Sequence, residues 1–126
     1  MIYGIGIDLV NIRRIEKALR RWGSRFQKRV FTPLEIRFCK KNPARSTARF
    51  ALCFAAKEAF SKALGTGIRK GVAWRQIEVL HEPSGRPYLQ LNGHAKRLCE
   101  AYGIKNSFVT LSDDGRYAAA MVVLEE

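Results

Sequence analysis

The alternation of apolar and polar residues predicts a chain that mixes helices with antiparallel strands. Its first ten residues, MIYGIGIDLV, read as a strand from Ile2 to Val10. Successive side chains of a strand point to opposite faces. One face therefore carries Tyr3, Ile5, Ile7 and Leu9, and the other carries Gly4, Gly6 and Asp8. We expect the first face to pack into the core. The glycines are expected to leave a shallow groove beside the carboxylate, where a ligand or another chain can approach.

The residues after this strand have the apolar spacing of a helix. Asn11 is placed to cap a helix that runs to about Trp22 and stops at Gly23. The apolar residues that recur at helical intervals are Ile12, Ile15, Leu19 and Trp22. The opposite face is basic and carries Arg13, Arg14, Lys17, Arg20 and Arg21.

The segments FTPLEIRFCKK and RSTARFALCFAAKEAFSKALG predict a short helix and a long one. Thr32 is placed as the N-cap of the short helix, followed by Pro33 in its first turn and Glu35 as the acid of a capping box. The long helix is expected from about Ala44 to Leu64. Gly65 is placed as its C-cap.

The second half of the chain changes character. QIEVLHEPSGRPYLQL predicts a hairpin that turns at residues 83–85, and SFVTLSDDGRYAAAMVVL predicts another that turns at residues 113–115. A helix between them is expected to end at Gly103. Helices and antiparallel strands without regular βαβ alternation indicate an α+β fold, with a small antiparallel sheet packed against a long central helix and shorter helices. The length suits one domain over residues 1–126.

Two acids stand among apolar residues. Asp8 lies near the end of the first strand, where capping the next helix is the alternative role. Glu58 lies in the long helix four residues before Lys62, where an exposed ion pair between these two side chains is the alternative. The long helix around Glu58 and Lys62 is apolar almost throughout, so a charge there needs a partner. Two separated carboxylates without a His or Cys cluster suit Mg²⁺, which keeps several waters and takes up substrate phosphate oxygens.

The loop GTGIRKG, which follows the long helix, fits phosphate chemistry. Its glycines allow backbone N–H groups to face an anion, and Arg69 and Lys70 add positive charge. It is not a Walker A loop, because the G-x-x-x-x-G-K-[ST] spacing and the following helix are missing. The preceding helix C-terminus repels anions, so side chains and loop amides must hold any phosphate there.

Composition narrows the class of protein. Hydrophobic residues make up 47% of the chain, too large a share for a disordered protein. No apolar run is long enough to cross a bilayer and no secretory signal is recognised, so we expect a cytoplasmic protein without a membrane partner. Cys39, Cys53 and Cys99 show no C-x-x-C pairing. We expect Cys53 and Cys99 to pack as small apolar groups.

The formal net charge of +12 is large for this length and implies an acidic partner. Nucleic acid, an anionic membrane, an acidic protein and a polyphosphate ligand all satisfy this requirement. Charge alone does not choose among them.

Three motifs narrow the choice: GIGIDLVNIRRIE at the start, FAAKEAFSKALGTGI in the middle and VTLSDDGRYAAAMVVLE at the end. With these motifs, the chain resembles the holo-[acyl-carrier-protein] synthase family, the small AcpS-type 4′-phosphopantetheinyl transferases. The resemblance implies the fold of those transferases and a Mg²⁺-dependent reaction. In it, 4′-phosphopantetheine moves from coenzyme A to a serine of apo-acyl carrier protein. Adenosine 3′,5′-bisphosphate is released, and the product supports fatty acid biosynthesis.

The resemblance also assigns residues. It implies Asp8 and Glu58 as ligands of Mg²⁺, Lys62 as a catalytic cation near the phosphates, and Gly65 and Thr66 with Lys62 in the coenzyme A-binding loop. The attacking serine needs a base, and Glu58 is the candidate, acting directly or through a metal-bound water. The resemblance further implies a homotrimer with active sites between subunits. The face of Gly4, Gly6 and Asp8 and the long helix are its expected interface elements.

The basic helix face fits an acidic acyl carrier protein. We expect Arg13, Arg14, Lys17 and Arg21 to dock the carrier, with Arg14 and Arg21 contributing most. A solvated helix face that binds nothing is the alternative.

The sequence departs from the family at two positions. Many members have an Arg where Cys53 stands and a His where Phe108 stands, and both residues are associated with coenzyme A. Arg45, Arg49 or a surplus lysine is expected to replace them. Arg49 is therefore included among the expected coenzyme A-binding residues.

A small basic module that binds RNA or DNA without enzymatic activity is the competing hypothesis. It accounts for the charge and for the aromatic residues among basic ones. It does not account for Asp8 beside glycines or for Glu58 in an apolar helix. The sequence also lacks a helix-turn-helix, zinc-finger or RRM motif. We therefore expect no nucleic-acid partner.

Overall fold

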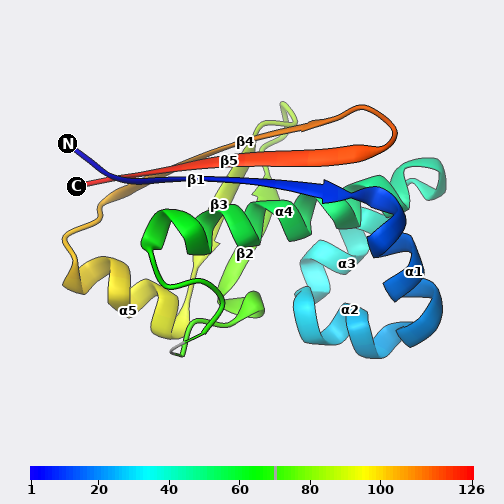
Figure 1. The fold of residues 1–126 in the computed structure, drawn as a ribbon, viewed down its shortest axis with the longest axis horizontal. Helices are drawn as coiled ribbons and strands as arrows, with labels where there is room; N and C mark the ends of the chain where they lie inside the picture. The colour runs from blue at the N-terminus through cyan, green and yellow to red at the C-terminus, as the bar shows by residue number, and fades with distance from the viewer. Residues whose placement is uncertain (70) are drawn as a thin grey trace.

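The computed structural model describes residues 1–69 and 71–126 (Figure 1). Lys70, one of the two cations expected in the GTGIRKG loop, lies outside the described residues. In chain order the elements are β1 (Ile2–Asn11), α1 (Ile12–Trp22), α2 (Ser24–Val30), α3 (Pro33–Lys40), η1 (Pro43–Arg45), α4 (Ser46–Leu64), η2 (Trp74–Gln76), β2 (Ile77–His81), β3 (Pro87–Leu91), α5 (Gly93–Ala101), β4 (Asn106–Asp113) and β5 (Tyr117–Glu125).

The strands form two antiparallel sheets, one of three strands in the order β1-β5-β4 and one of β2 and β3. The long helix α4 lies along one face of the three-stranded sheet and contacts β1 and β5 (Figure 1). Helices α1, α2 and α3 gather at one end of the molecule, and α5 lies at the other (Figure 1). The predicted α+β fold and both hairpins are confirmed, although the strands form two sheets. Within the described residues, no helix is long and apolar enough to cross a bilayer.

Local sequence signals place most helix ends correctly. The Asn11 side chain accepts a hydrogen bond from the backbone N–H of Arg13, and Thr32 and Glu35 form the predicted capping box. Gly65 ends α4 in the left-handed conformation, with φ of 92°. The long helix begins at Ser46, because residues 43–45 form the short 3₁₀ helix η1.

Helix α2 is an element that the sequence pattern does not predict. Gly23 ends α1 as expected, but the chain continues directly into the seven residues of α2. No side chain caps the start of this helix. Its apolar pattern consists of Phe26 and Val30, which is too little periodicity to reveal a helix.

The predicted orientation of β1 is wrong. The side chains expected in the core are exposed, at 59% for Ile5, 62% for Ile7 and 65% for Leu9. The opposite face lies against α4, as Figure 1 shows for the two elements. Both faces of β1 are free of charge up to Asp8, so hydrophobicity does not reveal which one meets the chain's own helix.

The glycines of β1 explain this orientation. A Cβ atom on Gly6 would overlap the carbonyl oxygen of Ala59, and one on Gly4 would overlap that of Ala63. The backbone of α4 therefore occupies the space that the missing side chains leave. The groove expected beside Asp8 is filled by this helix, so the glycine face and α4 pack on each other and are not open interface elements.

The three cysteines are free and buried. Burial is the main reason that the pKa of Cys39 rises to about 12 and that of Cys99 to about 11. The Sγ atom of Cys53 donates a hydrogen bond of 3.1 Å to Glu35. The expectation that Cys53 and Cys99 pack as small buried groups is confirmed, and Cys53 also belongs to a polar network.

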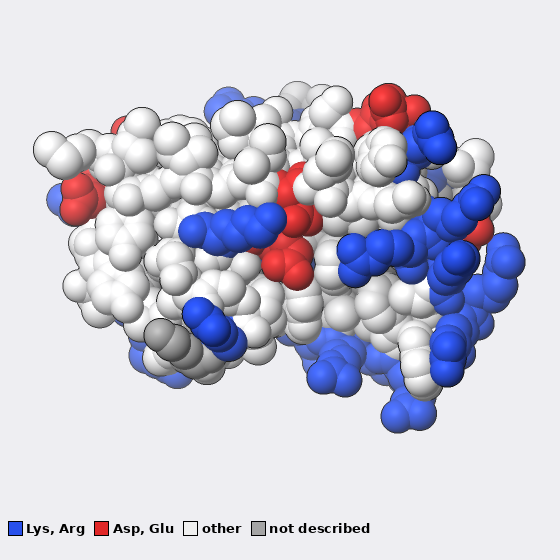
Figure 2. Space-filling model, viewed as in Figure 1, with Lys and Arg blue, Asp and Glu red and all other residues white. Residues whose placement is uncertain are grey.

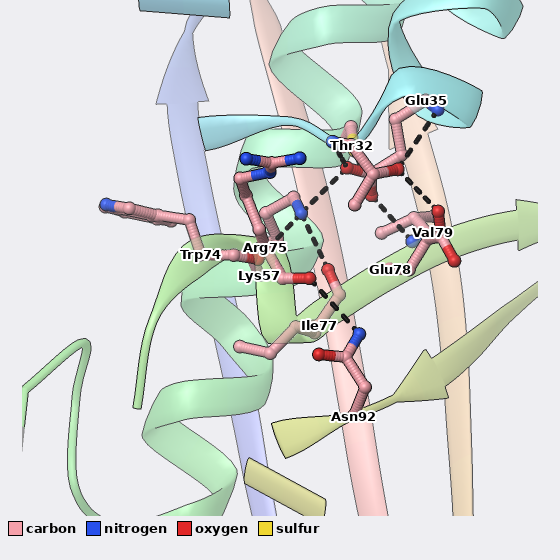
Figure 3. A network of polar contacts seen from close by, with 10 residues as sticks. Thr32, Glu35, Lys57, Trp74, Arg75, Ile77, Glu78, Val79 and Asn92 are labelled. Carbon is pink, nitrogen blue, oxygen red and sulfur yellow. Dashed lines mark hydrogen bonds and ion pairs between the residues drawn. The ribbon is translucent and has the colours of Figure 1, made fainter. Parts of the chain in front are cut away.

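That network is centred on a buried ion pair between α3 and α4 (Figure 3). The Nζ atom of Lys57 lies 2.9 Å from Oε1 of Glu35, and their side chains are 0% and 1% exposed. Lys57 also donates hydrogen bonds of 2.8 Å to the carbonyl oxygen of Trp74 and 2.7 Å to that of Ile77. The lysine thereby fixes η2 and the start of β2 to the middle of α4.

Glu35 holds the other side of the network. It accepts hydrogen bonds from the backbone N–H of Thr32, at 2.8 Å, and from that of Val79, at 2.7 Å (Figure 3). A buried carboxylate with this many donors is well compensated for its lost hydration. The capping acid of α3 therefore also connects α3 to β2, a role that the capping-box pattern does not reveal.

Replacing Lys57 tests how far the fold depends on this network. Lys57→Met leaves the Glu35 carboxylate buried without its cation, so the free energy of unfolding should fall by about 3–5 kcal/mol. Urea denaturation of the variant measures this loss. The double variant Lys57→Met/Glu35→Gln removes both charges and should lose less than Lys57→Met alone. Equal losses in the two variants would contradict the ion-pair interpretation.

Replacing a β1 glycine tests the close packing on α4. Gly6→Ala should lower the free energy of unfolding by about 3 kcal/mol, because the helix backbone must move. Gly85→Ala is the control: no atom lies within 4 Å of the added Cβ, although the φ of Gly85, at 94°, is unfavourable for alanine and that of Gly6 is not. The control should lose roughly 1 kcal/mol. Unfolding of the two variants at the same urea concentration would contradict close packing of Gly6 on α4.

Candidate active site

Asp8 and Lys62 meet where β1 crosses α4. The Nζ atom of Lys62 lies 2.9 Å from Oδ1 of Asp8 and donates a second hydrogen bond, of 3.1 Å, to the carbonyl oxygen of Ile7. The Asp8 side chain is 14% exposed and that of Lys62 is 52% exposed. Lys62 thus pairs across the helix–strand contact with Asp8, and not along the helix with Glu58.

Glu58 lies beside this pair, half-buried on α4. Burial is the main reason that its pKa is raised, and the negative charge of Asp8 raises the pKa further. The positive charges of Lys62 and Arg14 act in the opposite direction. The two carboxylates therefore share one electrostatic site, although they are 50 positions apart in the sequence. Figure 2 shows acidic side chains in the middle of this face with basic side chains on both sides.

The pair of carboxylates fits the hard cation expected from the sequence. Mg²⁺ commonly binds one or two protein carboxylates and completes its octahedron with waters and substrate phosphates. In residues 1–69 and 71–126 no group of three or more His, Cys, Asp or Glu residues is arranged to hold a metal. Asp8 and Glu58 would thus be its protein side-chain ligands. Burial and the charge of Asp8 together outweigh the positive charges of Lys62 and Arg14, so the pKa of Glu58 is raised.

The described part of the GTGIRKG loop, residues 65–69 and 71, follows directly after α4, whose last turn contains Lys62. Thr66 donates a hydrogen bond of 2.8 Å from its hydroxyl to the carbonyl oxygen of Gly67. Arg69 donates one of 2.8 Å to the carbonyl oxygen of Thr66. Gly65 and Thr66 therefore lie at the same end of α4 as Lys62, as expected, and the loop is shaped by its own side chains.

Arg49 lies apart from the Asp8, Glu58 and Lys62 cluster. It is nine positions before Glu58 on α4, which is about 14 Å along the helix axis. It borders a cavity of about 790 Å³ that is also lined by Arg45, Cys53, His81 and Tyr88. The structure of one chain therefore does not bring Arg49 and the carboxylate pair together.

The two arginines of this cavity are held differently. Arg45 forms two hydrogen bonds of 2.9 Å with the carboxylate of Asp113, which lowers the pKa of that acid. Arg49 donates to the carbonyl oxygen of Phe38 at 2.9 Å, and its guanidinium lies 4.3 Å from the centre of the Phe38 ring. His81 stacks on the same ring at 4.1 Å. Arg45 is thus paired with an acid, whereas Arg49 forms no ion pair with an acid in residues 1–69 and 71–126.

The basic face of α1 is exposed as expected. Figure 2 shows a dense group of basic side chains at the end of the molecule where α1 and α2 lie. Arg20 lies 3.6 Å from Glu16 and is partly neutralised, whereas Arg21 lies over the Trp22 ring at 4.9 Å. Helix α2 adds cations that the sequence analysis did not place on this surface, namely Arg25, Lys28 and Arg29. The sequence pattern does not place them there, because it does not predict α2.

Comparison with known proteins agrees with this architecture. Residues 4–122 match the family described as the 4′-phosphopantetheinyl transferase superfamily. The chain is 46% identical over 125 residues to a holo-[acyl-carrier-protein] synthase of Geobacter sulfurreducens, covering 99% of this chain and 98% of that protein.

Two solved structures show the same fold. The holo-[acyl-carrier-protein] synthase of Neisseria meningitidis has a TM-score of 0.92, with 36% identity and complete coverage of both chains. The Helicobacter pylori enzyme in complex with coenzyme A has a TM-score of 0.85, with 36% identity over 96% of this chain and 99% of that chain. From the matched residues and the shared fold together, we conclude that the chain belongs to the 4′-phosphopantetheinyl transferase superfamily.

Proposed function

We propose that this protein is a single-domain holo-[acyl-carrier-protein] synthase over residues 1–126, and that it acts in fatty acid biosynthesis. It transfers 4′-phosphopantetheine from coenzyme A to a serine of apo-acyl carrier protein and releases adenosine 3′,5′-bisphosphate. The observation that carries this proposal is the Asp8, Glu58 and Lys62 cluster at the contact of β1 and α4. It is supported by the family and by the coenzyme A complex of the Helicobacter pylori relative.

The chain's own residues supply three parts of the chemistry. Asp8 and Glu58 would hold Mg²⁺, which supplies Lewis-acid charge to the pyrophosphate oxygens when bound. Lys62 directs a second positive charge at the same phosphates. Gly65 and Thr66, in the loop that follows, would lie along the coenzyme A molecule.

Glu58 is the proposed base. It takes the proton of the serine hydroxyl as the serine oxygen bonds to the phosphorus on the pantetheine side, and the P–O bond to adenosine 3′,5′-bisphosphate breaks. The raised pKa of Glu58 makes it a stronger base than an ordinary glutamate. Burial and the neighbouring Asp8 thus tune this carboxylate for proton transfer.

The exposed face of the three-stranded sheet supports assembly of several copies, which we propose to be a homotrimer. Its exposed apolar side chains include Ile5, Ile7, Leu9, Phe108 and Met121. An apolar patch of this kind is typical of a protein–protein interface. An active site shared between subunits also accounts for Arg49, because the cavity of one copy could complete the carboxylate site of the next. In this arrangement Arg49 replaces the arginine that many relatives have at position 53.

The transfer reaction is tested directly by weighing the carrier. Apo-acyl carrier protein incubated with the enzyme, coenzyme A and Mg²⁺ should gain the mass of 4′-phosphopantetheine, and EDTA should prevent the gain. Asp8→Asn and Glu58→Gln should each reduce kcat by at least about 100-fold, because they remove a metal ligand or the base. Thermal unfolding of both variants serves as the control for the fold. Full turnover by either variant in excess Mg²⁺ would contradict the assignment of Asp8 and Glu58 as metal ligands.

We also propose that Arg13, Arg14, Lys17 and Arg21 dock the acidic carrier protein. Arg14 is the member nearest to the active site, since its charge reaches Glu58. Docking by this surface places the carrier beside the carboxylates. Electrostatic docking of this kind changes association more than chemistry and weakens with salt.

Removing one docking cation should therefore raise the KM for carrier protein. Arg21→Ala is expected to raise this KM about 3- to 10-fold at low salt, with little change in kcat, and to flatten its salt dependence. Arg97→Ala is the matched control, because Arg97 is exposed on α5 at the opposite end of the molecule. Identical salt dependence in wild type and Arg21→Ala would refute docking by this face.

A further inference from the structure

The Lys62 ammonium group is bound to Asp8, one of the two proposed metal ligands. Its Nζ atom donates to Oδ1 of Asp8 and to the carbonyl oxygen of Ile7, at 2.9 and 3.1 Å. Both acceptors are oxygen atoms of the kind that Mg²⁺ prefers. The ammonium group is thus the cation that neutralises Asp8 in the structure of the chain alone.

Asp8 would have to serve both as a metal ligand and as the ion-pair partner of Lys62. A metal ion bound to Asp8 would compete with Lys62 for the negative charge of this carboxylate, whose Oδ1 atom accepts the hydrogen bond. An ammonium group and a divalent cation that share one carboxylate also repel each other. Electrostatic competition therefore favours displacement of Lys62 from Asp8 when a metal binds.

We propose that Lys62 is a stand-in cation, which occupies the metal position on Asp8 until a divalent metal ion binds and then turns to the substrate phosphates. The inference rests on the proposed Asp8 and Glu58 metal site. Lys62 is thereby available to coenzyme A only after the carboxylates have been filled. Metal occupancy and phosphate binding are coupled through one side chain.

The freedom of Lys62 to move follows from its surroundings. Its side chain is 52% exposed, so water competes for the ammonium group, although the Asp8 side chain is only 14% exposed. The other lysine of the motif, Lys57, is fully buried and bound to Glu35 and two carbonyl oxygens, so it cannot change partners at low cost. The two lysines of FAAKEAFSK therefore have separate roles, one structural and one mobile.

The first test is metal affinity without coenzyme A. Mn²⁺ suits the same carboxylate ligands, and its binding to the full-length protein can be followed by water proton relaxation. Lys62→Met should bind Mn²⁺ about 3- to 10-fold more tightly than wild type, because the competing ion pair is gone. Arg14→Met is the matched control, since Arg14 also acts electrostatically on Glu58 but is not paired with Asp8 in the described residues. Its effect should be smaller than that of Lys62→Met.

The second test observes Lys62 itself. Adding Mg²⁺ to wild-type protein should raise the rate at which an amine-reactive acetylating reagent labels Lys62, measured by peptide mass spectrometry. Lys96, which is exposed on α5, is the internal reference and should not change. Thermal unfolding of Lys62→Met checks that the variant is folded.

The outcomes separate the two proposals. Tighter Mn²⁺ binding by Lys62→Met together with Mg²⁺-dependent labelling supports the stand-in role. Equal Mn²⁺ affinities of wild type, Lys62→Met and Arg14→Met would overturn the stand-in role while leaving the metal site intact. Absence of Mn²⁺ binding in wild type and in Lys62→Met would overturn both the metal site and the inference that rests on it.

Discussion

The close contact of β1 with α4 is the constraint on which the rest of the structure depends. It is possible only because Gly4 and Gly6 have no side chains where the backbone of Ala63 and Ala59 passes. The chemistry follows from the same contact. Asp8 comes two residues after Gly6 on the same face of the strand, and Glu58 and Lys62 directly precede the two alanines on the helix. Close packing therefore brings a strand carboxylate to a helix carboxylate and a helix lysine.

The same contact has a consequence for assembly. With the glycine face of β1 covered by α4, the large apolar side chains of the strand point away from the core and remain exposed in one chain. In the proposed homotrimer a second copy would cover them, and the Arg49 cavity of one copy would lie beside the carboxylates of a neighbour. The buried pair of Glu35 and Lys57 holds α3, α4 and β2 together, and so it shapes the cavity that this arrangement requires.

The sequence predicted the elements well and their contacts less well. Caps, turns and helix ends depend on local backbone chemistry, so Asn11, the Thr32 capping box and Gly65 were correctly interpreted. The orientation of β1 was wrong because an apolar strand does not show which face meets its own helix. Lys57 and Glu35 were not paired because their contact joins segments that no local pattern connects. Asp8, Glu58 and Lys62 were selected from their apolar surroundings and a family resemblance, and the structure brings the three together.

The central claim is that the β1–α4 contact builds one cation site from Asp8 and Glu58. A crystal structure of the protein grown with coenzyme A and Mn²⁺ tests it most directly, because the metal is located by its anomalous scattering. The account predicts an anomalous peak within ligand distance, about 2.0–2.3 Å, of oxygen atoms of both carboxylates, with Lys62 withdrawn from Asp8. A metal peak elsewhere, or a pyrophosphate bound without a metal while Lys62 stays on Asp8, would contradict it.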